Sequence, residues 1–175
     1  MKTSLALIGF MGTGKTVVGK ALAEKLGKAF TELDALIEQK AGKTIPEIFQ
    51  QDGEVAFREL EIEVTREVSQ KKNVVIACGG GIVLNKINID RLKRESLIIY
   101  LTALPGVILK RTASDENERP LLEVTNKTSA IQRLLKFRKP FYERAADITV
   151  DTSKLDIDSV TEQIIAKVKA DESYH

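Results

Sequence analysis

Short apolar segments alternate with longer amphipathic segments along the chain. The apolar segments are 4–8, 29–33, 74–78, 97–101 and 147–151, and several of them are nearly continuous in apolar residues. Such runs are typical of strands that are buried on both faces of a sheet. Because these strands alternate with helical segments, the pattern predicts a parallel sheet with helices on both faces.

Helical spacing of apolar residues marks the segments between the expected strands. One helix begins near Lys15 and closes at Gly27, a residue type favoured just past a helix end. Another begins at Thr44, because Thr44 and Glu47 have the spacing of a capping box and Pro46 lies near the first turn. Further helices are expected over about 54–70, 105–113, 128–143 and 156–169.

A polar, charged segment at about 113–128 interrupts this alternation. Its composition alone favours a solvated surface loop. We find no internal repeat, low-complexity tract or interdomain linker, so one domain is expected over 1–175, with a frayed tail at about 170–175.

Composition favours a globular protein and gives no support for a nucleic-acid or membrane partner. Apolar residues make up 43% of the 175 residues and charged residues 30%, an ordinary globular balance. A net charge of +2 gives no support for a nucleic-acid partner. The single cysteine, Cys78, excludes an internal disulfide and favours a reducing compartment. With no signal-peptide pattern and no run of membrane-spanning length, we expect a cytoplasmic protein with no membrane partner.

The segment "GFMGTGKT" follows the first expected strand and opens the first expected helix. It fits the phosphate-loop pattern of glycine, four residues, glycine, lysine, and serine or threonine. Its glycines permit close approaches that a β-carbon would block, so successive N–H groups can converge on phosphate oxygens at a helix N-terminus. Lys15 is expected to reach the β- and γ-phosphates, and the Thr16 hydroxyl to bind Mg²⁺.

Two further features follow expected strands and so lie at the same edge of the predicted parallel sheet as the phosphate loop. Ligands of open α/β sheets bind at this edge, beyond the carboxyl ends of the strands. Asp34 follows the second strand, either as the N-cap of the next helix or as a substrate contact. The run Gly79, Gly80 and Gly81 follows the third strand. A plain turn rarely needs three glycines, which favours close approach of a ligand.

Three arginines are candidates for binding anions. Arg58 lies opposite the apolar stripe of its helix, where it either walls a pocket or extends along the surface. Arg138 continues an apolar row and therefore needs an anionic partner, which is either an acidic side chain or a substrate carboxylate. Arg119 lies in the polar segment, where it is solvated unless the segment closes over the phosphates as a lid.

Together these motifs resemble the shikimate kinases. The resemblance extends from Gly9 to Thr152 and rests, besides the phosphate loop, on "LDALIEQKAGKTIPEIFQQDGEVAFRELE", "GGG", "RPLL" and "RKPFYERAA". It implies a P-loop NTPase-like, three-layer α/β/α fold with a five-stranded parallel sheet in the order 2-3-1-4-5. It also implies transfer of the γ-phosphoryl group of MgATP to the 3-hydroxyl of shikimate, on the route to chorismate. We expect a monomer whose ligands are ATP, Mg²⁺ and shikimate.

The resemblance implies roles for individual residues. The catalytic residues would be Lys15, Asp34 and Arg119. The shikimate site would consist of Asp34, Arg58, Gly79, Gly80, Gly81 and Arg138. The nucleotide site would consist of Gly12, Thr13, Gly14, Lys15, Thr16, Val17, Arg111 and Arg119, with Arg111 stacked on adenine and Arg119 carried by the lid.

The chain departs from the family pattern at two places. Glu32 stands where the family usually has an aspartate that assists Mg²⁺ through water, so the carboxylate is one methylene further from the backbone. After "VDT" the chain continues with "SKLDID" instead of the proline that many members pack against adenine.

Two other functions remain open from the residues alone. A different small-molecule kinase of the phosphate-loop class, such as a gluconate or nucleoside monophosphate kinase, would share the phosphate chemistry and differ in its acceptor. A regulatory module would still bind nucleotide through the phosphate loop but would not catalyse phosphoryl transfer. A panel of phosphoryl acceptors separates these functions from shikimate phosphorylation.

Overall fold

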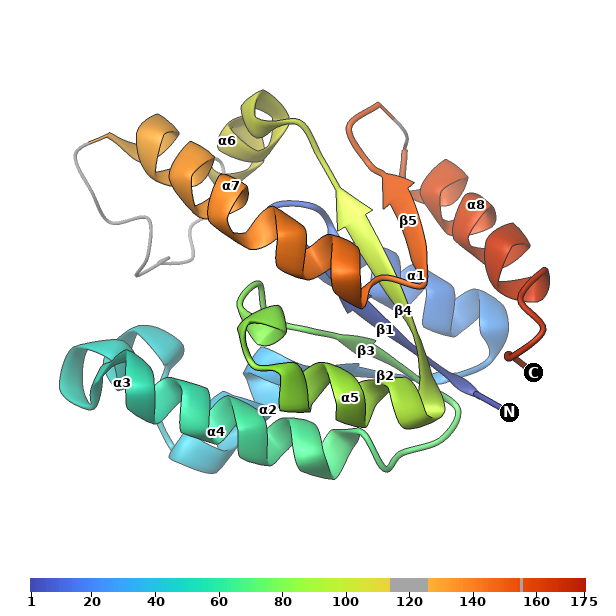
Figure 1. Cartoon of the computed structure of the whole chain (residues 1–175), viewed down its shortest axis with the longest axis horizontal. Coiled ribbons are helices and arrows are strands. Elements are labelled where there is room, and N and C mark those ends of the chain that lie inside the picture. The colour runs from blue at the N-terminus through green and yellow to red at the C-terminus, as the bar shows by residue number, and fades with distance from the viewer. Residues whose placement is uncertain (114–125, 155) are drawn as a thin grey trace.

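A parallel sheet of five strands forms the centre of the computed structural model, which describes residues 1–113, 126–154 and 156–175 (Figure 1). The predicted fold class and the strand order 2-3-1-4-5 are confirmed, because the sheet runs β2-β3-β1-β4-β5. The strands are β1 (Ser4–Ile8), β2 (Ala29–Glu32), β3 (Val74–Ala77), β4 (Ser96–Thr102) and β5 (Ile148–Asp151).

Helices cover both faces of this sheet. The helices α1 (Lys15–Leu26) and α8 (Ile157–Lys169) pack on one face. The other face is covered by α2 (Leu33–Ala41), α3 (Ile45–Gln51), α4 (Gly53–Val68), the 3-10 helix η1 (Ile82–Leu84), α5 (Lys86–Glu95), α6 (Pro105–Ala113) and α7 (Lys127–Ala145).

The strands are continuously apolar because successive side chains enter two different cores. In β1, Ala6 and Ile8 belong to the core under α4, α5 and α7, whereas Leu5 and Leu7 belong to the core under α1 and α8. All four are fully buried. Side chains alternate across a strand, so a sheet covered on both faces needs apolar residues at every position.

The helix-end signals in the sequence operate as expected. The Thr44 hydroxyl accepts from the N–H of Glu47 at 3.3 Å, and the Glu47 carboxylate accepts from the N–H of Thr44 at 2.7 Å. Gly27 closes α1 in the left-handed conformation, with φ of 63°. The predicted capping box and glycine terminus are confirmed.

Two parts of the described chain differ from expectation. The helix α5 (Lys86–Glu95) was not predicted from the sequence. The tail, expected to fray, instead pairs with the N-terminus: Lys2 N donates to Ser173 O at 2.7 Å, and His175 N donates to Lys2 O at 2.9 Å. The ring of Tyr174 lies 5.2 Å from the Lys28 ammonium, measured to its centroid. Most of the expected lid, about 113–128, lies outside the described residues, as does Arg119.

No helix within the described residues is both long enough and apolar enough to cross a bilayer.

Candidate active site

A cavity of about 1490 Å³ opens beyond the carboxyl ends of β1, β2, β3 and β5. Every predicted site residue that the structure describes lines this cavity. These residues are Gly12, Thr13, Gly14, Lys15, Thr16, Val17, Glu32, Asp34, Arg58, Gly79, Gly80, Gly81, Arg111 and Arg138. The topology therefore gathers the candidate phosphate-binding and acceptor-binding groups in one space.

The glycine-rich loop between β1 and α1 wraps around its own lysine. The Lys15 ammonium donates to the carbonyl of Gly9 at 2.7 Å and to that of Phe10 at 2.9 Å. Gly12 has φ of 77°, and Gly14, the N-cap of α1, has φ of 93°. Residues other than glycine rarely adopt these backbone angles. The loop and the N-terminal end of α1 line the cavity, and backbone N–H groups at a helix N-terminus stabilise a bound anion.

Two oxygen-bearing side chains lie together beside this loop. The Thr16 hydroxyl donates to the Glu32 carboxylate at 3.2 Å. Oxygen ligands suit Mg²⁺, which usually takes one or two protein groups together with substrate phosphates. Within the described residues no group of three or more histidine, cysteine, aspartate or glutamate side chains forms a metal site. Thr16 and Glu32 fit a magnesium ion that is held mainly by a nucleotide.

Arg111 joins the phosphate loop to the end of β5. Its guanidinium donates to Gly12 O at 3.1 Å and to Thr152 O at 2.8 Å. The Thr152 hydroxyl in turn lies 3.0 Å from Thr13 O. Arg111 was expected to stack on adenine, and the structure adds that the same side chain ties the loop to its surroundings.

Asp34 does not cap a helix. Glu32 is the N-cap residue of α2, without a side-chain cap, and Asp34 lies in the first turn. The N-cap alternative for Asp34 is therefore wrong. Its Oδ1 is buried and has no hydrogen-bond partner among the described residues. Burial raises the pKa of this carboxyl, and the charge of Lys15 opposes the shift. The carboxylate is available to accept a hydrogen bond from a ligand.

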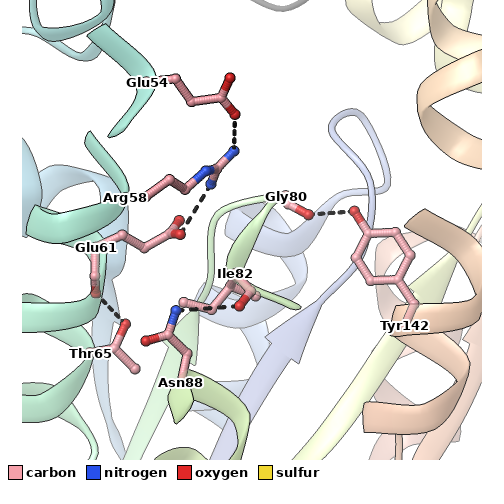
Figure 2. Close-up of polar contacts among 8 residues, drawn as sticks. All are labelled: Glu54, Arg58, Glu61, Thr65, Gly80, Ile82, Asn88 and Tyr142. Atoms are coloured by element: carbon pink, nitrogen blue, oxygen red, sulfur yellow. Dashed lines mark hydrogen bonds and ion pairs between the residues drawn. The ribbon is translucent and has the colours of Figure 1, made fainter. Parts of the chain in front are cut away.

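Arg58 turns into the cavity between two glutamates of its own helix (Figure 2). Its Nη1 contacts Glu61 Oε1 at 3.0 Å, and its Nη2 contacts Glu54 Oε1 at 3.3 Å. The Glu61 side chain is only 1% exposed. Burial raises the pKa of Glu61 to about 6 against the opposing effect of Arg58. The surface alternative for Arg58 is thus excluded by the structure.

The three consecutive glycines make room for charged side chains of the site. A β-carbon at Gly79 would lie 2.8 Å from Asp34 Oδ1, and one at Gly81 would collide with the Arg58 guanidinium. At Gly80 it would lie 3.2 Å from Arg138 Nη1. We expected close approach of a ligand to explain this run. In the structure, three protein side chains occupy that space.

Arg138 is 2% exposed and its Nη1 lies against Gly80. Its Nε is buried without a hydrogen-bond partner among the described residues. One turn later on α7, the Tyr142 hydroxyl donates to Gly80 O (Figure 2). Arg138 lines the cavity, and no ion pair to a described acidic side chain neutralises its charge there, which fits an anionic ligand better than a purely structural role.

Three residues of the site were missed in the sequence. Glu61 reads as a solvated glutamate, although it lies on the buried stripe of α4 between Phe57 and Val64. Its position on that stripe was the available signal. Tyr142 and Thr152 gave no comparable signal, because their hydroxyls meet backbone carbonyls 62 and 139 residues away.

Comparison with known proteins adds a family to this geometry. The family model described as "Shikimate kinase" matches residues 11–169. The shikimate kinase of Thermodesulfovibrio yellowstonii is 46% identical over 93% of this chain and 92% of its own length. The shikimate kinase of Caldanaerobacter subterraneus is 47% identical over 93% of this chain and 94% of its own length. The structure of the Acinetobacter baumannii shikimate kinase in complex with shikimate superposes with a TM-score of 0.93 at 38% identity, covering 98% of this chain and 96% of that one.

Proposed function

Since this chain belongs to the shikimate kinase family, we propose that it transfers the γ-phosphoryl group of MgATP to the 3-hydroxyl of shikimate, giving shikimate 3-phosphate and ADP. The observation that carries the proposal is the placement of Arg58 and Arg138. They come from α4 and α7, pack against Gly81 and Gly80, and face the cavity that also holds Lys15. Two guanidinium groups beside a phosphate loop suit an acceptor that carries a carboxylate.

On the nucleotide side, Lys15 and the loop N–H groups would hold the phosphates, and the Thr16 hydroxyl would be a ligand of Mg²⁺. The bound ion would neutralise charge on the phosphate oxygens. Glu32, whose carboxylate lies 3.2 Å from the Thr16 hydroxyl, would assist the ion through a water molecule. Arg111, which lines the cavity and donates to Gly12 O, would stack on adenine and keep the loop fixed. Arg119, which lies outside the described residues, would join these groups when the lid closes.

On the acceptor side, Arg58 and Arg138 fix the substrate carboxylate. Asp34, which lines the cavity, orients the attacking hydroxyl and accepts its proton. A general base works best with a pKa near the working pH, and burial shifts the pKa of Asp34 in that direction. Rate enhancement then comes from positioning and charge stabilisation, with no covalent enzyme intermediate.

An acceptor panel with ADP release as the readout tests this function. We expect turnover with shikimate and none with gluconate or nucleoside monophosphates. Efficient turnover of gluconate or a nucleotide, with none of shikimate, would overturn the proposal. Tight ATP binding without turnover of any acceptor would instead favour a regulatory module.

A monomeric state and a cytoplasmic location are also part of the proposal. The single cysteine supports the location, and the family resemblance supports the monomeric state. Light scattering of the purified protein tests the first, and fractionation of the source cells tests the second.

A further inference from the structure

The triple-glycine loop has no side chains of its own to hold it in place. It follows β3, precedes η1, and lines the cavity at all three positions. Its central residue, Gly80, is held from α7 by the Tyr142 hydroxyl, which donates to the Gly80 carbonyl. Figure 2 shows this contact reaching the loop from the side opposite Arg58. The position of the loop therefore depends on a residue outside it.

Tyr142 is itself fixed by its surroundings. Its side chain is fully buried, and its ring stacks on that of Tyr100 with centroids 5.0 Å apart and planes inclined by 20°. Burial raises the pKa of the Tyr142 phenol to about 12, with Arg138 opposing the shift. The hydroxyl therefore remains a protonated donor at any pH at which a cytoplasmic enzyme works.

The same turn of α7 carries the second group that touches Gly80. Arg138 lies four residues before Tyr142, on the same face of the helix. Its Nη1 would lie 3.2 Å from a β-carbon at Gly80, while Gly81 is packed still more closely against the Arg58 guanidinium. The loop is thus the spacer between the two guanidinium groups. Its placement sets their separation.

We propose that Tyr142 is a positioning residue for the acceptor, which fixes the spacing of Arg58 and Arg138 by holding the carbonyl of Gly80. The inference rests on the proposed function. It concerns the acceptor half of the site first, because Tyr142 itself contacts no residue of the phosphate loop among the described interactions. A β-carbon at Gly80 would reach Gly9 O and Met11 N only at 3.7 Å, an ordinary van der Waals distance. The proposal therefore predicts that loss of the Tyr142 hydroxyl raises the KM for shikimate and leaves the KM for ATP unchanged.

Tyr142→Phe is the direct test, since it keeps the ring stack and removes only the hydroxyl. It leaves a buried carbonyl without its donor. We expect the KM for shikimate to rise roughly tenfold, equivalent to about 1.4 kcal/mol, with the KM for ATP within about twofold of wild type. Direct calorimetric titration with shikimate and with ADP checks that the KM changes are binding changes.

Tyr100→Phe is the matched control. It removes a hydroxyl from the other ring of the same stack, and among the described residues no hydrogen bond joins that hydroxyl to the loop. We expect both KM values to stay at wild-type levels. If Tyr142→Phe leaves the KM for shikimate unchanged, or raises both KM values equally, the positioning role is wrong.

Gly80→Ala gives a second route if the phenylalanine variant does not fold. Its β-carbon presses on Arg138 without altering Tyr142, so the same selective rise in the KM for shikimate is expected. An unchanged KM would show that the spacing of Arg138 from the loop is unimportant. Absence of shikimate turnover in the wild-type protein would overturn the proposed function, and this inference with it.

Discussion

Charged side chains lie close together in the acceptor half of the site. Arg58 contacts the buried Glu61, and Asp34 Oδ1 and Glu61 Oε2 both lie close to Gly79. Each of these two oxygens lacks a hydrogen-bond partner among the described residues. Unsatisfied buried polar atoms are costly, and a ligand that supplies donors recovers part of that cost. These oxygens thus favour an acceptor that carries hydroxyl donors, whereas the guanidinium groups of Arg58 and Arg138 favour one that also carries a negative charge.

Removal of either cavity arginine tests the carboxylate assignment. Arg58→Ala or Arg138→Ala removes a charge-assisted contact to the acceptor and leaves the phosphate loop intact. We expect kcat/KM for shikimate to fall by about a hundredfold or more, with ATP affinity nearly unchanged. Lys15→Ala should instead impair phosphate handling with any acceptor.

Steady-state kinetics and nucleotide titration measure these effects. Arg66→Ala and Arg133→Ala, at exposed positions of the same two helices, are the matched controls. Wild-type acceptor kinetics in both cavity variants would contradict the assignment.

Glu61 makes the stability of the fold depend on pH. The pKa of this carboxyl is raised from its ordinary value of 4.5 to about 6 by burial. The folded protein therefore holds this proton to higher pH than the unfolded chain, so its stabilising contribution is present below pH 4.5 and is lost as pH rises through 6. Relative to Glu61→Gln, wild type should lose about 2 kcal/mol of unfolding free energy over this range.

Urea denaturation of the two proteins between pH 4 and pH 7.5, a range chosen to bracket both pKa values, measures this difference. Glu59→Gln, at an exposed position of α4, is the control for the substitution itself. A wild-type to Glu61→Gln difference that stays constant with pH would rule out the effect.

At the scale of elements, the phosphate loop is anchored from two distant parts of the chain. Arg111 of α6 donates to Gly12 O, and Thr152 at the end of β5 holds Thr13 O. The loop is rich in glycine and so loses more conformational entropy on ordering than other segments. These two contacts lower the freedom of the empty loop and so the cost of binding phosphate.

Thr152→Val tests this anchor, since valine keeps the shape of the side chain and loses the hydroxyl. The hydroxyl donates to Thr13 O and Thr102 O and accepts from Arg111 Nη1, so the substitution also loosens Arg111. We expect the KM for ATP to rise by about fivefold or more, and the KM for shikimate to stay unchanged. Thr149→Val, at an exposed position of β5, is the control. An unchanged KM for ATP in Thr152→Val would mean that Arg111 alone holds the loop.

The elements that could be predicted are those with strong local signals. Buried strands, the capping box at Thr44 and the phosphate loop each have a pattern within a few residues. The helix α5 was missed because only a few of its residues, including Ile89 and Leu92, face the core, while Ile87 is exposed. The site divides in the same way. Arg138 stands out as a charge in an apolar row and Arg58 as a charge opposite the apolar stripe of its helix, whereas Tyr142 acquires its contact only through the fold.

In the whole molecule, the cavity and the paired chain termini lie at opposite ends of the strands of the sheet. The cavity opens at the carboxyl ends of the strands, and both termini meet near the start of β1 (Figure 1). The tail pairs with Lys2 through backbone hydrogen bonds and covers part of the core with Tyr174. Stability can therefore be changed at one edge without disturbing the site at the other.

Deletion of residues 173–175 tests this separation. It removes two backbone hydrogen bonds to Lys2 and the contact of the Tyr174 ring with Lys28. We expect a loss of about 2 kcal/mol, which lowers the Tm by roughly 4–8 °C for a chain of this size. The KM values for both substrates should not change, and Glu172→Ala, an exposed substitution just before the deletion, should leave the Tm unchanged. A thermal scan with parallel kinetics decides the matter: an unchanged Tm would show that the tail adds nothing to the fold, and altered KM values would show that the two edges are coupled through the sheet.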